Sequence, residues 1–356
     1  MKLEKMLNDV VESGASDVFV VAGLPLTYRV DGKQLRKQDD PMRPADTEEL
    51  IKALYNLANR PMQPFEDSHN HDDDFSFALP GTGRFRANVF RQRGSYGAVI
   101  RVIPFDLPTP EELNIPKEVM DLANLTKGLV LVTGPAGAGK SSTLACIIDD
   151  LNTKRSGHII TMEDPIEFVH KHKKSIVTQR EVPTDVATYA EAMRSAMREA
   201  PDIMLLGEMR DPETIAAAMT AAEMAQLMFS TLHTTSAANT IDRIVAAVPP
   251  SQQRQIRMQL AMVLQAVVSQ QLVPSVDGGV VPAFEIMYAT PAIRNLIREQ
   301  KSHQIDSVIA AGRHMGMRTM DQSLFELAKD GKITEETALH YAIHHDALKN
   351  RFDAAK

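Results

Sequence analysis

The sequence predicts an α/β protein in which a small mixed domain precedes a larger domain with a parallel sheet and a helical C-terminal part. Three observations support this class. Strand-like segments alternate in hydrophobicity before residue 104 but are apolar throughout after residue 118, and prolines gather between the two positions. A glycine-rich loop follows the first apolar strand. Since strands that are apolar throughout are buried on both faces, the second domain is expected to carry helices on both sides of a parallel sheet.

The first domain is expected over residues 1–103. Apolar residues at positions 3, 6, 7, 10 and 11 predict an amphipathic helix, and Asp31-Gly32 predicts a turn. A hairpin is expected where Pro80–Gly83 joins two alternating segments, with Arg84 and Arg86 on one face of the second strand. The strands are predicted over 18–21, 27–30, 74–79, 84–89 and 98–103.

The rest of the chain divides into a linker, a core and a helical end. Pro104, Pro108, Pro110 and Pro116 interrupt both helix and central strand, so a linker is expected over 104–118. The α/β core is expected over 119–290, with apolar strands at 129–132, 159–162, 203–206 and 227–229, the last of which continues to Leu232. Helices are expected over 291–356, one of them opened by a capping box of Thr319 and Gln322.

Composition excludes several classes of protein. The 356 residues suffice for about two domains, and 44% hydrophobic with 24% charged residues is typical of folded chains. A net charge of -7 gives no global attraction to nucleic acid or anionic lipid. Cys146 is the only cysteine, so no intrachain disulfide can form. Without an apolar run long enough to cross a bilayer, the chain is expected to be cytoplasmic, with neither nucleic-acid partners nor direct lipid insertion.

A phosphate-binding loop is the most specific motif. The sequence G-x-x-x-x-G-K-S follows the apolar strand at 129–132 and leads into a predicted helix. In such a loop, backbone N–H groups surround the phosphates of ATP, Lys140 reaches the β and γ phosphates, and the Ser141 hydroxyl binds Mg²⁺. The predicted nucleotide-binding residues are Gly134, Pro135, Ala136, Gly137, Ala138, Gly139, Lys140, Ser141 and Ser142.

Carboxylates and a histidine end three other apolar strands. Glu208 follows the strand at 203–206, where it can polarise the attacking water, and Glu163 with Asp164 follows the strand at 159–162, where the pair can hold Mg²⁺ through water or orient the nucleophile. His233 follows the strand at 227–232 and can bond the γ-phosphate. The alternative is structural: strand-end acids that satisfy loop amides, and a buried, hydrogen-bonded histidine.

Five arginines are candidates for charge compensation. Arg84, Arg86, Arg91 and Arg93 lie in the first domain, either as a solvated face or as groups that act in trans on a neighbouring subunit's site. Arg210 lies two residues after Glu208 and either acts in the same way or pairs with a nearby acid.

Together these motifs resemble the PilT-like type IV pilus retraction ATPases of the secretion ATPase superfamily, over almost the whole chain. Beyond the loop, the resemblance is carried by MEDPIEF at 162–168, GEMRD at 207–211, TLHTTSAA at 231–238, GRFR at 83–86 with FRQR at 90–93, and AIRNLIRE at 292–299. The loop departs from the family at Ala136, Ala138 and Ser142. These positions contribute mainly backbone amides, so hydrolysis is expected to survive.

The resemblance implies a homohexameric ring of PAS-like first domains and RecA-like second domains, with ATP and Mg²⁺ between subunits. It makes Glu208 the catalytic carboxylate, Glu163 an organiser of water or Mg²⁺, and His233 a γ-phosphate contact, with Arg84, Arg86 and Arg91 as candidates for contacts in trans. The implied activity is ATP hydrolysis that powers pilus retraction and twitching motility. The implied partner is a platform protein at the inner face of the cytoplasmic membrane, and a paralogous motor ATPase is a further candidate.

Other functions stay open at this stage. An assembly or type II secretion ATPase is expected to carry a long N-terminal extension and a four-cysteine zinc motif, and this sequence has only Cys146. An accessory nucleotide-binding ring subunit, which scaffolds or regulates a separate motor, is poorly excluded by the sequence. A DNA-translocating ring is disfavoured by the acidic net charge and by the lack of a basic aromatic groove.

Overall fold

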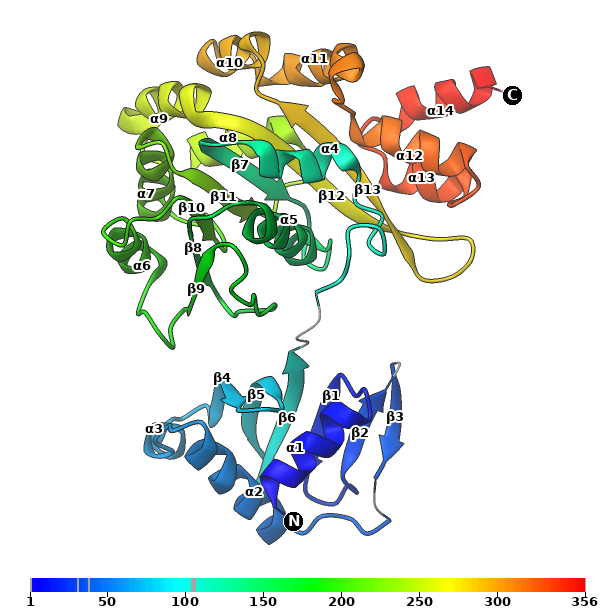
Figure 1. Cartoon of the computed structure of the whole chain (residues 1–356). Coiled ribbons are helices and arrows are strands. Elements are labelled where there is room, and N and C mark those ends of the chain that lie inside the picture. Colours follow the sequence, from blue (N-terminus) through cyan, green and yellow to red (C-terminus); the bar gives the residue numbers. More distant parts are fainter. Residues whose placement is uncertain (1, 31, 38, 104–106, 356) are drawn as a thin grey trace. The chain divides into compact units, whose positions relative to one another are not determined.

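The computed structural model describes residues 2–30, 32–37, 39–103 and 107–355. Two compact units make up the chain (Figure 1). Unit 1 comprises Met1–Asp106 with Glu167–Val169, and unit 2 comprises Leu107–Ile166 with His170–Lys356. Asp31 of the predicted turn and residues 104–106 of the predicted linker lie outside the described residues. The division into four segments at 103, 118 and 290 stays a prediction.

Unit 1 is an antiparallel sheet with helices. Its strands pair in the order β3-β2-β1-β6-β5-β4, and every pair is antiparallel. The strands are β1 (Asp17–Val21), β2 (Thr27–Val30), β3 (Lys33–Arg36), β4 (Asp72–Leu79), β5 (Gly83–Gln92) and β6 (Ser95–Ile103), and the helices are α1 (Leu3–Glu12), α2 (Pro44–Leu57) and α3 (Gln63–Asp67).

The alternation of β5 fixes which of its faces is buried. Phe85, Ala87 and Val89 have no solvent exposure, whereas Arg84 and Arg86, which alternate with them, are half-buried, as the sequence predicts. The predicted hairpin is present, because Leu79 pairs with Gly83 across its turn. The apolar stripe of α1 packs into the same core.

Unit 2 is built on a seven-stranded sheet in the order β13-β12-β7-β11-β10-β8-β9, in which only the β12–β13 pair is antiparallel. Its strands are β7 (Gly128–Thr133), β8 (His158–Glu163), β9 (Ile176–Glu181), β10 (Ile203–Leu206), β11 (Leu227–Leu232), β12 (Leu264–Pro274) and β13 (Val280–Tyr288).

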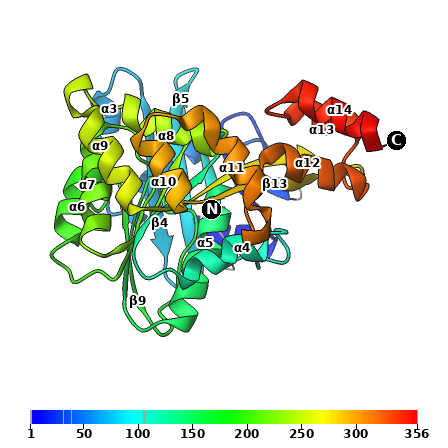
Figure 2. The ribbon, with the colours of Figure 1, turned by 90° about the horizontal axis from the view of Figure 1, so that it is seen from above.

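The helices of unit 2 connect and cover these strands. The α-helices are α4 (Lys117–Met120), α5 (Lys140–Lys154), α6 (Tyr189–Ala196), α7 (Pro212–Glu223), α8 (Ala237–Ala246), α9 (Pro250–Val263), α10 (Pro291–Arg298), α11 (Ile305–Ala311), α12 (Met320–Lys329), α13 (Glu335–Tyr341) and α14 (His345–Ala355). Short 3₁₀ turns are η1 (Asp121–Asn124), η2 (Ser302–Gln304) and η3 (Gly312–Met315). In Figures 1 and 2, α12, α13 and α14 gather at one end of the unit, where they form a separate small core.

Burial on both faces explains the apolar strands of unit 2. Leu129 and Leu131 of β7 enter a core with helices α6 to α11, whereas Val130 and Val132 enter a second core with α4 and α5. Because successive side chains of a strand point to opposite faces, both sets must be apolar. The sheet is therefore covered on both sides, as predicted.

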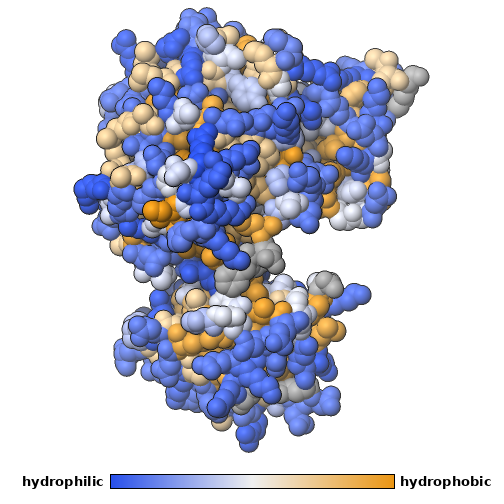
Figure 3. Space-filling model, viewed as in Figure 1, coloured by the Kyte–Doolittle hydropathy of each residue, from blue (hydrophilic) through white to orange (hydrophobic). Residues whose placement is uncertain are grey.

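Local signals set the helix starts. Asp211 caps α7 by accepting hydrogen bonds from the N–H groups of Glu213 and Thr214. Thr319 caps α12 by accepting from the Gln322 N–H, but the Gln322 side chain donates to Glu326, so the predicted reciprocal capping box is half formed. Figure 3 shows a mostly hydrophilic surface on the visible face. Over the described part of the chain, no helix combines the length and hydrophobicity needed to cross a membrane.

Candidate active site

The phosphate-binding loop links β7 to α5. Gly134, Gly137 and Gly139 all have positive φ, and Gly139 is the left-handed residue immediately before α5. A Cβ on Gly134 would collide with the backbone oxygen of Gln270, so only glycine fits there. The first N–H groups of α5 lack partners within the helix, which makes this end an anion-binding site.

Lys140 and the neighbouring strand β12 hold the loop in shape. The Lys140 Nζ donates to the backbone oxygens of Gly134 and Pro135, both at 2.9 Å. Gln270 of β12 accepts a 2.8 Å hydrogen bond from the Thr143 hydroxyl of α5. The loop thus keeps an open, glycine-lined shape, and its lysine already points into it. These features fit the phosphates of a nucleotide.

The other predicted residues of unit 2 lie along the same sheet edge. Strands β7, β11, β10 and β8 are consecutive neighbours and run parallel. Their C-terminal ends therefore carry, in that order, the phosphate loop, His233, Glu208 and Glu163-Asp164. Ligands of open α/β sheets bind at this edge.

Glu208 contacts two basic side chains at this sheet edge. Its Oε2 lies 2.7 Å from Arg210 Nε and 3.4 Å from His233 Nε2. The Glu208 side chain is 16% exposed, whereas those of Arg210 and His233 are 70% and 47% exposed. The hydrogen bond and charge of Glu208 raise the pKa of Arg210. Arg210 therefore pairs with an acid in this structure, whereas its role in charge compensation stays a prediction, and the His233 side chain is exposed rather than buried.

Hydrogen bonds from its own strand, β8, and from the neighbouring strand, β9, hold Glu163. Its Oε1 accepts hydrogen bonds from the Thr161 hydroxyl at 2.6 Å and from Gln179 Nε2 at 3.3 Å. Asp164, the next residue, is exposed. The carboxylate of Glu163 thus has a defined orientation, while that of Asp164 faces solvent.

Tyr189 is a residue of this edge that sequence reasoning missed. Its hydroxyl oxygen lies 2.7 Å from the position that a Cβ on Gly207 would take. Burial raises the pKa of Tyr189 above its usual range, and the charges of Asp164, Glu163 and Glu208 add to this effect. Tyr189 therefore lies beside Gly207, at the sheet edge that carries these carboxylates. Its only sequence signal was its place at the start of α6, directly after the capping Thr188.

The predicted arginines of unit 1 lie on a different unit from the loop. Arg86 forms a bidentate ion pair with Asp74, at 2.9 and 2.6 Å. Arg91 donates to the Tyr96 hydroxyl at 2.9 Å and stacks over the Tyr96 ring. Arg84 projects from the same strand, half-buried. These geometries describe unit 1 by itself, and action in trans stays a proposal.

A parallel strand, a glycine loop at the start of a helix and acids at the neighbouring strand ends define a P-loop nucleoside triphosphatase. Residues 1–320 match the family described as type II/IV secretion system protein, and the chain belongs to that family.

Two relatives and one solved structure resemble almost the whole chain. The type IV pilus retraction ATPase PilT of Pseudomonas aeruginosa is 48% identical over 95% of this chain and 97% of its own length. A twitching motility protein of Neisseria gonorrhoeae is 44% identical over 90% of this chain and 85% of its own length. The crystal structure of the pilus retraction motor PilT with bound ADP matches with a TM-score of 0.89 and 45% identity, covering 98% of this chain and 99% of that one. The predicted α/β fold and the resemblance to retraction ATPases are confirmed.

Proposed function

We propose that this chain is the ATP-hydrolysing subunit of a hexameric motor that powers type IV pilus retraction. One observation carries the proposal: neighbouring parallel strands bring the phosphate loop, His233 and Glu208 to one edge of the sheet. The similarity to a retraction ATPase over 95% of the chain supports pilus retraction over pilus assembly.

In this function the loop binds the phosphates of ATP. Lys140 exchanges the carbonyl oxygens of Gly134 and Pro135 for phosphate oxygens, which are stronger acceptors because they are charged. The Ser141 hydroxyl, with Glu163 and Asp164 through water, would hold Mg²⁺, which neutralises charge on the phosphates. Ala136, Ala138 and Ser142 stay compatible with the site because they supply backbone N–H groups.

Glu208 orients and polarises the attacking water. Arg210 and His233 keep its carboxylate at the mouth of the site, and both are exposed enough to turn toward the γ-phosphate once nucleotide binds. The Tyr189 hydroxyl fills the space beside Gly207, the residue directly before Glu208. The charge that develops on the phosphate then meets Lys140, His233 and Arg210.

The motor acts through contacts with neighbouring subunits and with a platform protein of the pilus. Arg84, Arg86 and Arg91 of one subunit complete the site of the next, so hydrolysis changes how neighbouring subunits pack. The ring works at the inner face of the cytoplasmic membrane on a platform protein of the pilus, through protein contacts. A paralogous motor ATPase is a second candidate partner.

The test is a surface pilus count with retraction imaging. It compares a deletion strain with strains complemented by the wild-type chain, by Glu208→Gln and by Glu213→Gln. The last is a matched control, because Glu213 also pairs with an arginine but is exposed and lies outside the site. Excess static pili in the deletion and Glu208→Gln strains, with normal retraction for Glu213→Gln, is the expected result. Lost pili would identify an assembly motor, and normal retraction with Glu208→Gln would identify a non-hydrolysing accessory subunit.

A further inference from the structure

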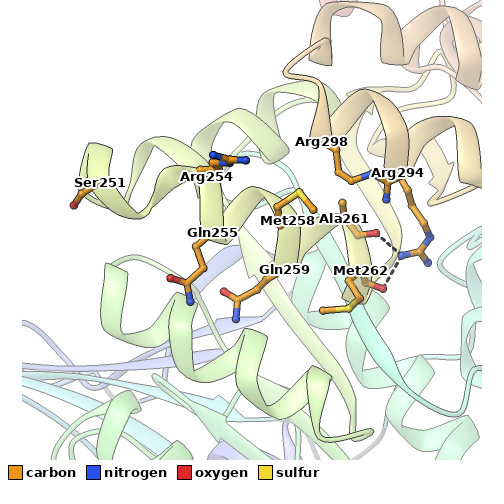
Figure 4. Close-up of a pocket in the computed structure, with 9 residues that line it drawn as sticks. All are labelled: Ser251, Arg254, Gln255, Met258, Gln259, Ala261, Met262, Arg294 and Arg298. Atoms are coloured by element: carbon orange, nitrogen blue, oxygen red, sulfur yellow. Dashed lines mark hydrogen bonds between the residues drawn. The ribbon is translucent and has the colours of Figure 1, made fainter.

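A groove of about 850 Å³ runs between α9 and α10 of unit 2 (Figure 4). None of its lining residues belongs to the phosphate loop or to the strand ends of the nucleotide site. The groove is therefore a separate surface, which the proposed ATP chemistry does not use.

Arg294 fixes one wall of this groove. Its Nη1 donates to the backbone oxygens of Ala261 and Met262, both at 2.7 Å, as Figure 4 shows. These oxygens belong to the last turn of α9, where carbonyl groups lack partners within the helix. Burial lowers the pKa of Arg294, and the charge of Arg298 adds to this effect. Arg294 thus ties α10 to the end of α9 and gives the groove a fixed shape.

Two other guanidinium groups bring positive charge to the groove. Arg254 on α9 and Arg298 on α10 are exposed, and within the described part of the chain neither guanidinium group forms a hydrogen bond or an ion pair. Among the described residues, none of those that line the groove is acidic. Two acids lie beside it: Glu223 of α7 accepts a 3.3 Å hydrogen bond from Gln259, and Glu299, which follows Arg298, pairs with Lys301 at 2.8 Å. In a chain with a net charge of -7, this is a local positive surface.

Two methionines give the groove its apolar character. Met258 and Met262 lie one turn apart on α9 and are 51% and 63% exposed. An unbranched thioether adapts to differently shaped partners, and methionines are common at surfaces that bind amphipathic segments. The groove therefore pairs an apolar strip with cations on both helices.

We propose that this groove binds an acidic amphipathic segment of a partner protein. Apolar side chains of the segment pack on Met258 and Met262, and its carboxylates pair with Arg254 and Arg298. A two-fold contact with a second copy would place the arginines opposite one another, which is unfavourable. A concave site between two helices also fits a single segment better than a planar lipid surface.

The experiment uses a photo-crosslinking amino acid at position 262 of the full chain, in the cells that normally produce it. The crosslinked peptides are sequenced by mass spectrometry. The expected product is a segment of another protein in which Asp or Glu alternates with apolar residues. In an Arg254→Glu/Arg298→Glu background its yield should fall about tenfold or more. A Lys329→Glu/Lys349→Glu background changes the net charge equally and should leave the yield unchanged.

Several outcomes would overturn the proposal. They are a crosslink to this same chain, a crosslink to a neutral or basic segment, no crosslink, and a yield that survives the arginine reversal. Sedimentation with phosphatidylglycerol vesicles that only the arginine reversal abolishes would assign the groove to lipid. Phosphate release by the arginine-reversed protein should equal that of the wild type, which excludes misfolding. The Glu208→Gln protein should lose phosphate release but keep the crosslink. Phosphate release therefore tests the proposed ATPase function, and the crosslink tests the groove.

Discussion

Substitution of Gly207, the residue directly before Glu208, tests how closely Tyr189 packs against this part of the site. A Cβ at this position would lie 2.7 Å from the Tyr189 hydroxyl and 3.2 Å from the backbone oxygen of Met162. Gly207→Ala must therefore push the Tyr189 side chain away. Overpacking of this kind costs about 1–3 kcal/mol. For a domain of the size of unit 2, that corresponds to a fall of roughly 2–12 °C in the thermal midpoint.

The contact is with a hydroxyl, so removing that hydroxyl should relieve it. Tyr189→Phe leaves the ring in place and clears the oxygen nearest to the new Cβ. In a double-mutant cycle, Gly207→Ala should then be milder in the Tyr189→Phe protein than in the wild type, by about 0.5–3 kcal/mol. Thermal unfolding of the four nucleotide-free proteins measures this coupling. Strictly additive effects would refute the reasoning that the hydroxyl blocks the site of the Cβ.

Three further predictions follow from buried or capping groups. Burial raises the pKa of Cys146 to about 11, so its thiol should react with maleimide far more slowly in the folded than in the unfolded chain, and equal rates would contradict this. Burial raises the pKa of Glu285 from 4.5 to about 7, so its contribution to stability is present below pH 4.5 and is lost as the pH rises through 7. Between pH 5 and 8 the unfolding free energy should therefore fall more in the wild type than in Glu285→Gln, by roughly 3 kcal/mol at most, and the thermal midpoint should fall with it. Equal pH dependence of the two thermal midpoints would contradict this. Asp211→Ala should remove the cap of α7 and cost about 1 kcal/mol, most of which Asp211→Asn should restore, as measured by thermal unfolding.

Local patterns were sufficient to predict the strands that carry the site. The strand β10 occupies residues 203–206 and β11 residues 227–232, as predicted, because each begins with an apolar run and is followed within two residues by a polar side chain, Glu208 or His233. The parallel order of such strands then places Glu208 and His233 near the phosphate loop. Only the fold could show that Arg210 pairs with Glu208.

The strand β12 was not predicted, and its residues explain why. It begins directly after α9, with no glycine or proline between them, and Ser269 and Gln270 interrupt its apolar run. Both polar residues are buried because they bond with Thr133 and Thr143, which lie more than a hundred residues earlier in the chain. A local pattern contains no information about such distant partners. Tyr189 was missed for the same reason, because its relation to Gly207 exists only in the folded chain.

The most direct test of the central claim, that this sheet edge hydrolyses ATP, is phosphate release by the purified chain with Mg²⁺ and ATP. Lys140→Ala should abolish release by removing the lysine that reaches the phosphates, and Glu208→Gln should lower it at least about a hundredfold by removing the base. Glu213→Gln should leave it unchanged. Release by the Glu208→Gln protein at the wild-type rate would contradict the claim.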